Sequence, residues 1–211
     1  MKKIKYELQH IIISDGQDGT TSQLKKTQNF LRRNAEASVR NKDEKPLKRE
    51  EEISLIEFAE KENLIYKDHI LEANFISAGA EQRVYRFDDF HVIKLNDAIF
   101  YQCWLDYFNS LLIHNHFFHS TAYEFLGFKR IDENLFAVVK QEFIIATEET
   151  DLSSVKEFLA YNRFINTRNN DYFNPDWGVI FEDLHDENVL SRNMILYFID
   201  TVFYVTKDFY L

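Results

Sequence analysis

The chain has 211 residues, of which 45% are hydrophobic and 20 are Phe, so it carries enough apolar bulk for one core, which excludes a predominantly disordered chain. Five Gly and two Pro exclude collagen-like or low-complexity chains, and the single cysteine, Cys103, excludes an internal disulfide framework. No apolar run approaches the roughly 18 residues of a spanning helix, and the N-terminal stretch is not a signal-peptide core. We therefore expect a soluble, cytoplasmic protein without a membrane partner.

The net charge of -10 is unevenly distributed along the chain. Residues 1–50 hold 12 Lys and Arg against 7 Asp and Glu, whereas residues 51–211 hold 13 against 28. This division predicts a basic N-terminal appendage over 1–50, with a linker at 41–50, followed by one acidic domain over 51–211. Basic residues 22–50 could bind nucleic acid or an acidic partner, although such runs are more often a solvated helix and linker.

The residues before position 73 favour helices. Residues 15–22 are rich in Gly and Asp and predict a loop, and residues 22–38 predict a helix with a sparse apolar set. Apolar residues between Ile53 and Leu64 recur at helical spacing and predict an amphipathic helix.

From residue 73 the pattern changes to short apolar strands, interrupted by a helix at 98–113 and by a second helix opened by a capping box at Ser154–Glu157. The expected strands lie at 74–76, 82–87, 91–95, 123–128 and 135–139, and then at 179–181, 189–190, 195–199 and 203–205. This order predicts an α+β fold that begins with an antiparallel sheet.

Three polar residues near the C-terminal strands have the chemistry of a phosphoryl-transfer site. Asp183 is followed five residues later by Asn188, and Asp200 closes the next apolar strand. A carboxylate accepts the proton of an acceptor hydroxyl, and amide and carboxylate oxygens are ligands that Mg²⁺ prefers beside phosphate. The alternative is that Asp and Asn are simply favourable loop residues.

Two upstream features match this chemistry. The small residues Ala78, Gly79 and Ala80 form a turn between strands, where backbone can approach phosphate closely. Lys94 lies in an apolar strand after this turn, as does the lysine that holds nucleotide phosphates in kinases. The alternatives are an ordinary hairpin turn and a surface-facing strand lysine.

Together these motifs resemble the protein-kinase-like superfamily. The resemblance rests on Gly79-Ala80-Glu81, Val92-Ile93-Lys94, the loop from Asp183 to Val189, and Phe198-Ile199-Asp200. It narrows to the small kinase domain of polyvalent proteins of phages and conjugative elements through the Gly-Ala-Glu turn, the stretch from Trp104 to Phe118, and Val139–Phe143.

The resemblance implies a two-lobed kinase fold, with an antiparallel N-lobe over about 51–140 and a reduced C-lobe over about 144–211. It implies transfer of the γ-phosphoryl of ATP, with Mg²⁺, to a hydroxyl of a protein or small molecule. The implied roles are a catalytic base at Asp183, metal ligands at Asn188 and Asp200, a phosphate-holding lysine at Lys94, a phosphate-covering turn at Ala78, Gly79 and Ala80, and an adenine-binding hinge at Gln141, Glu142 and Phe143.

The lysine of this pattern ordinarily pairs with a glutamate on the next helix, and residues 98–113 contain none. Gln102, Asp106 and Glu81 are the candidates to pair with Lys94. Two alternative functions follow, a non-catalytic kinase-like module that binds nucleotide or a partner, and a nucleic-acid-associated accessory protein of a mobile element. We interpret His114, His116 and His119 as structural or hydrogen-bonded histidines rather than metal ligands.

Overall fold

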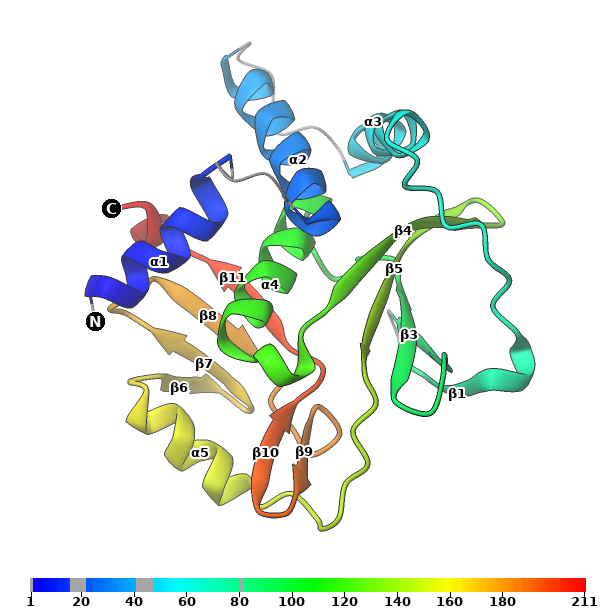
Figure 1. The fold of residues 1–211 in the computed structure, drawn as a ribbon. Coiled ribbons are helices and arrows are strands. Elements are labelled where there is room, and N and C mark those ends of the chain that lie inside the picture. Colours follow the sequence, from blue (N-terminus) through cyan, green and yellow to red (C-terminus); the bar gives the residue numbers. More distant parts are fainter. Residues whose placement is uncertain (1, 16–21, 41–47, 80–81) are drawn as a thin grey trace. The chain divides into compact units, whose positions relative to one another are not determined.

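The structure, a computed structural model, describes residues 2–15, 22–40, 48–79 and 82–211, with backbone alone for 37–40 (Figure 1). The chain divides into two compact units, each described by itself. Unit 1 comprises Met1–Asp15, Asn109–Ala122 and Ile144–Leu211, and unit 2 comprises Gly16–Phe108 and Tyr123–Phe143. The domain boundaries expected from the sequence stay predictions.

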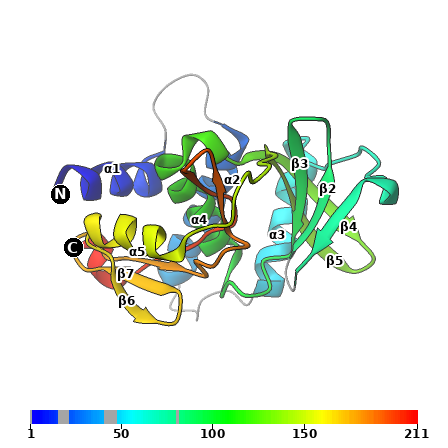
Figure 2. The ribbon, with the colours of Figure 1, turned by 90° about the horizontal axis from the view of Figure 1, so that it is seen from below.

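Unit 2 is built on a five-stranded antiparallel sheet in the order β1-β2-β3-β5-β4 (Figure 2). Its strands are β1 (Phe75–Ala78), β2 (Gln82–Arg86), β3 (His91–Asn96), β4 (Glu124–Ile131) and β5 (Asn134–Glu142), with a short 3-10 turn, η1 (Glu72–Asn74), ahead of β1. One face of the sheet carries a hydrophobic cluster in which Tyr85 lies opposite Ile93, beside Leu95 and Val138. Alternation along each strand places every second side chain on this face.

Two helices of unit 2, α2 (Gln23–Arg40) and α3 (Lys48–Lys61), contact β4. The rings of Phe30 and Phe58 stack between them at 4.2 Å. Of the expected linker 41–50, residues 41–47 and the loop residues 16–21 lie outside the described residues, whereas residues 48–50 form the first turn of α3. Helix α3 thus starts before residue 51, and the linker itself stays a prediction.

Unit 1 contains a four-stranded antiparallel sheet in the order β11-β8-β7-β6 and a separate β9–β10 hairpin. Its strands are β6 (Ile165–Arg168), β7 (Asp171–Asn174), β8 (Val179–Glu182), β9 (Val189–Arg192), β10 (Ile195–Phe198) and β11 (Val202–Val205). Its other elements are α1 (Lys2–Ile13), α5 (Leu152–Tyr161), η2 (His119–Thr121) and η3 (Lys207–Tyr210), and α4 (Trp104–Phe117) gives residues to both units. Both ribbon views show α5 beside the β6–β7 hairpin (Figures 1 and 2).

Helix α1 was not expected from the sequence. It buries Leu8 and Ile12, one helical turn apart, and its polar side chains reach η3. The Lys5 Nζ donates to the backbone oxygen of Asp208 at 2.7 Å, and Gln9 Nε2 donates to that of Phe209 at 2.6 Å. The side chains of Lys5 and Gln9 thus cap backbone carbonyls of η3. Because η3 is about 200 residues away in the sequence, a local pattern does not reveal this contact.

The α+β class with antiparallel sheets is confirmed, and the boundaries of two helices needed correction. Helix α4 begins at Trp104 rather than residue 98, and β6 and β7 were missed. Helix α5 begins at Leu152 because Asp151, not Ser154, is its N-cap, accepting from Ser153 N at 2.9 Å. Among the described residues, no helix is long and apolar enough to cross a membrane.

Hydrogen bonds from Ser153 and Ser154 lower the pKa of Asp151 to about 2 from its ordinary value of 3.8. Its charged form therefore stabilises the folded state fully above about pH 3.8, and this contribution is lost as the pH falls through about 2. We predict that Asp151→Asn unfolds at lower urea than the native chain at pH 7, and that the difference shrinks toward pH 2.

Glu157→Gln, which changes an exposed acid on the same helix, is the matched control for urea midpoints measured between pH 2 and 7. A difference between Asp151→Asn and the native chain that stays constant with pH would contradict a charge-dependent cap.

Candidate active site

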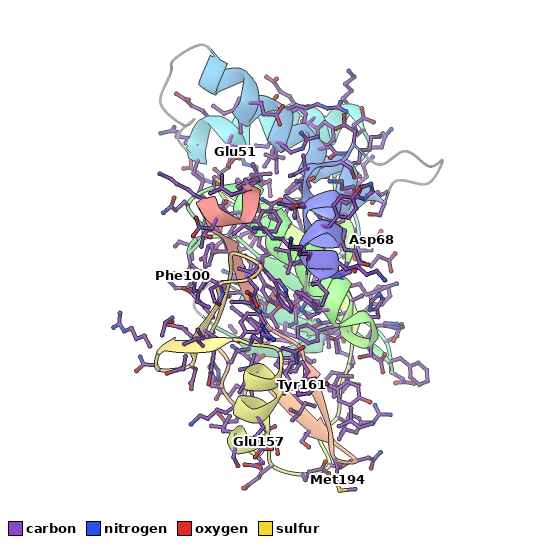
Figure 3. All side chains as sticks on the ribbon, turned by 90° about the vertical axis from the view of Figure 1, so that its left-hand side faces the viewer. Glu51, Asp68, Phe100, Glu157, Tyr161 and Met194 are labelled. Atoms are coloured by element: carbon purple, nitrogen blue, oxygen red, sulfur yellow. The ribbon has the colours of Figure 1, made fainter. Side chains whose placement is uncertain are left out.

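The β9–β10 hairpin brings two of the expected site residues together. Asn193 and Met194 form its two-residue turn with φ of 53° and 62°, the left-handed pair of a type I′ turn. Figure 3 labels Met194 at the hairpin tip. At the open end, the N–H of Ile199 donates to the backbone oxygen of Asn188 at 3.0 Å, and that of Asp200 does so at 3.4 Å. The register therefore places Asn188 beside Asp200.

The Asn188 side chain is fixed against Asp183. Its Nδ2 donates to Oδ2 of Asp183 and to the Asp183 backbone oxygen, each at 2.8 Å. Asp183 has φ of 65°, a left-handed conformation that Asp tolerates better than most residues. Because both donations come from the amide nitrogen, the amide oxygen of Asn188 points away from Asp183.

Two residues that the sequence analysis missed also hold Asp183. Oδ1 of Asp171, on β7, accepts the backbone N–H of Asp183 at 3.2 Å. Nε2 of His185 lies 3.3 Å from the other carboxylate oxygen, Oδ1. The N–H of Glu187 donates to Nδ1 of His185 at 3.2 Å, and Nε2 of His185 also lies 3.1 Å from Nδ2 of Asn188, so the ring is held between Asp183 and Asn188. Only the Asp-Leu-His order hinted at this histidine.

The strand ends next to this loop carry several acids. Val202, the first residue of β11, pairs with Glu182, the last residue of β8. Asp183, which follows β8, and Thr201, which precedes β11, therefore lie at the same end of the sheet. Burial raises the pKa of Glu182, and the charges of Asp171 and Asp183 raise it further. The pairing thus brings Asp200, the neighbour of Thr201, to the same end of the sheet as Asp183.

Polar residues of α4 and η2 secure the segment around Asp200. Nε2 of His114 donates to the Thr121 backbone oxygen at 2.8 Å, so Nδ1 accepts from the Thr201 hydroxyl at 2.7 Å. The Thr121 hydroxyl donates to the Phe198 backbone oxygen at 2.6 Å. His114 is fully buried, and the interpretation of it as a hydrogen-bonded histidine is confirmed.

In unit 2, Lys94 lies at the centre of the sheet. Its Cα pairs with Val84 of β2 and Val139 of β5, and the residue is only 3% exposed. Its Nζ lies 5.5 Å from the centroid of the Tyr123 ring. The alternative of a surface-facing lysine was wrong. Alternation with Ile93 places the Lys94 side chain on the sheet face opposite the hydrophobic cluster.

The small-residue turn after β1 is described as far as Gly79, and Ala80 lies outside the described residues. Ala78 is the last residue of β1, and the N–H of Gly79 donates to the Gln82 backbone oxygen at 2.8 Å. A Cβ added at Gly79 would meet no atom within 4 Å among the described residues beyond its chain neighbours, whereas one added at Gly127 would lie 2.3 Å from the Leu64 backbone oxygen. Packing therefore demands a glycine at position 127 and not at position 79.

The expected hinge residues are at the end of β5. Gln141 is 2% exposed, Glu142 is exposed, and Phe143 is half-buried directly after the strand. The guanidinium of Arg86 lies 3.9 Å from the centroid of the Phe143 ring, a cation–π contact that orders this ring.

Of the candidates to pair with Lys94, Glu81 lies outside the described residues. Gln102 is exposed and precedes α4, so it does not lie on that helix. Asp106 stands in the first turn of α4. Which residue pairs with Lys94 stays a prediction.

The first turn of α4 is capped by α3, which the sequence analysis also missed. An oxygen of Glu51, labelled in Figure 3, accepts the backbone N–H of Trp104 at 2.7 Å. The neighbouring Glu52 accepts from Nε1 of the Trp104 indole at 3.2 Å. Burial raises the pKa of Glu51. Burial and the nearby acids Asp106 and Glu51 raise the pKa of the Cys103 thiol to about 12, which disfavours the reactive thiolate at neutral pH.

Several side chains of the basic segment are engaged within unit 2. Lys26 pairs with Glu62 at 2.5 Å, and Arg32 pairs with Glu36 at 2.8 Å. Lys48 donates to the Asp97 backbone oxygen. Binding of nucleic acid or an acidic partner through residues 22–50 stays a prediction.

The expected residues thus fall into two groups. Unit 1 brings together Asp183, Asn188 and Asp200 in one loop and hairpin, and unit 2 carries Ala78, Gly79, Lys94 and residues 141–143 on one sheet. An Asp followed five residues later by an Asn, with a further Asp after the next short strand, has the spacing of a kinase catalytic loop.

Comparison with known proteins gives the family. Residues 48–207 match the family model described as a serine/threonine/tyrosine kinase found in polyvalent proteins. The match covers most of the chain, and the chain belongs to this kinase family. The searches of curated proteins and of solved structures found no match.

The bonds from Asn188 to Asp183 predict a measurable effect of Asn188→Ala. Losing both donations should cost roughly 1 kcal/mol of unfolding free energy and speed amide hydrogen exchange across residues 183–189. Asn166→Ala is the matched control, because its Nδ2 also donates to two backbone oxygens, in the β6–β7 hairpin. Unchanged exchange at 183–189 would show that Asn188 does not hold the loop.

Proposed function

We propose that the protein is a phosphotransferase that moves the γ-phosphoryl group of ATP, with Mg²⁺, to a hydroxyl of a protein or small molecule. The observation that carries this proposal is the double donation from the Asn188 amide to Asp183. These two hydrogen bonds orient the Asp183 carboxylate. They leave the amide oxygen of Asn188, which lies beside Asp200, able to bind a cation.

The donor set in unit 1 fits Mg²⁺ bound together with nucleotide. Among the described residues, no group of three or more His, Cys, Asp or Glu side chains is arranged to hold a metal by itself. Mg²⁺ in nucleotide-dependent enzymes is bound by one or two protein oxygens plus phosphate oxygens and water, which Asn188 and Asp200 would supply in part. When bound, the ion would neutralise phosphate charge.

The chemistry assigned to this chain is proton acceptance and positioning. The exposed Asp183 carboxylate would take the proton of the acceptor hydroxyl as its oxygen bonds to the γ-phosphorus and the bond to the ADP oxygen breaks. His185 and Asn188 orient that carboxylate, and Asp171 holds its backbone. His114 and Thr121 would act as positioning residues, because they secure the segment that carries Asp200.

A two-lobed kinase fold is part of the proposal, with the sheet of unit 2 as the N-lobe. There Lys94 would hold ATP phosphates, with Gly79 leaving space for them.

Strand register supports an adenine-binding role for the end of β5. The N–H of Phe143 donates to the Phe90 backbone oxygen at 2.7 Å, so the adjacent pair, His91 and Glu142, is a non-hydrogen-bonded one. The backbone groups of Glu142 therefore point away from β3, toward the β4 side of β5. On that side β4 extends only to Glu124, which pairs with Lys140, so among the described residues Glu142 has no partner strand there. Glu142 would contribute its backbone N–H and carbonyl to adenine.

We predict that Asp183→Asn lowers phosphoryl transfer roughly 100- to 10,000-fold, the usual worth of a general base. Asp186→Asn, in the same loop, is the matched control and should retain activity. The assay follows labelled γ-phosphate from ATP into the protein, a cell extract or water. Binding of Mg·ATP without transfer to any of these acceptors would contradict the proposed phosphotransferase activity and favour the non-catalytic module.

We also predict that Mg·ATP raises the melting temperature of the native chain and that Asp200→Ala abolishes this rise, because the variant lacks a proposed metal ligand.

We predict that Gly79→Val weakens ATP binding at least tenfold while leaving the melting temperature of the free protein unchanged, because a side chain there meets only open space. Gly127→Ala is the contrasting variant and should lower the melting temperature, since its Cβ would collide with backbone. Calorimetric titration with Mg·ATP measures the first effect. Equal ATP affinity in Gly79→Val and the native chain would remove this turn from the phosphate site.

A further inference from the structure

Unit 1 contains a cavity of about 210 Å³ whose wall is almost entirely aromatic. Phe181 and Phe203 form its floor, with rings stacked 4.1 Å apart, and each is 1% exposed. Phe117 and Trp177 form a second stacked pair in the wall, at 5.5 Å. We call this space the aromatic cavity. Stacked, buried rings keep their positions, so the space between them is preformed.

The aromatic cavity opens beside the C-terminal end of α5. Phe158, on that helix, is 40% exposed, and Asn162, the C-cap of α5, is half-buried. Figure 3 labels the neighbouring Tyr161 at this end of the helix. The lining of the aromatic cavity therefore includes partly exposed residues at the end of α5 as well as the buried pair Phe181 and Phe203.

One wall residue carries an unused hydrogen-bond donor. Trp177 is 5% exposed, and its indole Nε1 is buried with no acceptor among the residues that the structure describes. Its backbone is held in place, because Trp177 N–H donates to Oδ1 of Asn174 at 3.1 Å. A buried N–H without an acceptor costs free energy, so this donor favours a ligand that brings one.

We propose that the aromatic cavity binds a small, neutral aromatic compound that bears a hydrogen-bond acceptor. Its volume suits one or two fused rings, because a cavity of about 150 Å³ already accepts benzene. No residue lining it is charged, which disfavours an ion. Water is the competing occupant, and it finds few polar partners here because Trp177 and Asn162 are the only polar side chains in the lining.

The test compares quinoline with naphthalene, which have the same shape and differ by one ring nitrogen that accepts a hydrogen bond. Titrations of the full chain are followed by the indole N–H signals in ¹H–¹⁵N spectra, one from each of the two tryptophans. We expect saturable binding, with quinoline about tenfold tighter than naphthalene and shifting the Trp177 signal downfield.

Two variants make the result specific. Trp177→Phe keeps a ring in the wall and removes the donor, so the preference for quinoline should fall below about twofold while naphthalene still binds. Trp104→Phe is the matched control, because that indole already donates to Glu52 and lies outside the cavity, so the preference should persist. The signal that remains in Trp104→Phe identifies Trp177 even if Trp177→Phe does not fold.

Three outcomes would overturn the proposal. They are the absence of saturable binding of either compound, equal affinities in the native chain without movement of the Trp177 signal, and a quinoline preference that survives Trp177→Phe. The second would show an ordinary apolar cavity whose indole donor is satisfied by water.

Discussion

The candidate active site depends on one backbone hydrogen bond, from the N–H of Ile199 to the carbonyl oxygen of Asn188. This bond closes the β9–β10 hairpin at its open end and sets the register that puts Asn188 next to Asp200. A shift of the register by one residue would reverse the face of every side chain on β10 and carry Asp200 away from the loop. The type I′ turn at Asn193 and Met194 fixes the same register from the other end, so strand pairing brings the two polar residues together, and the bonds to Asp183 then fix the Asn188 side chain.

A second constraint is the pairing of β8 with β11, which serves two regions of unit 1. At one end of the pair, Asp183 follows β8 and Asp200 precedes β11. Within the pair, Phe181 and Phe203 lie directly opposite each other and form the floor of the aromatic cavity. His114 and Thr121 bind the backbone and hydroxyl groups on both sides of Asp200, and a buried network whose members are all satisfied favours a single arrangement. The rigid aromatic packing and the polar loop are therefore parts of one structural unit.

The sequence predicted those features that depend on local pattern, and it missed those that depend on tertiary contacts. Local pattern predicted the strands in which polar and apolar residues alternate clearly. It also revealed the spacing of Asp183, Asn188 and Asp200, because each of these features lies within a short segment of the sequence. Asp171 could not, because its role comes from a bond to a residue on a neighbouring strand that local pattern does not reveal. Helix α1 and the capping of α4 by Glu51 were missed for the same reason, since their partners, in η3 and in the first turn of α4, are far away in the sequence. The start of α5 was misplaced because a better cap, Asp151, lies one turn before the predicted one.

The glycines show how a structure separates positions required for folding from positions available for function. Gly127 and Gly178 have φ of 139° and 69°, and a Cβ at either would come within 2.5 Å of backbone atoms, so the fold itself explains these residues. Gly79 does not have a left-handed backbone, and no described residue beyond its chain neighbours lies within 4 Å of a Cβ built there, so the described part of the fold leaves room for a larger side chain. Its small size therefore has no cause within unit 2 as described. A glycine that the described part of the fold does not require leaves room for another molecule to approach the backbone, which supports the proposed role of this turn at the phosphates of a nucleotide.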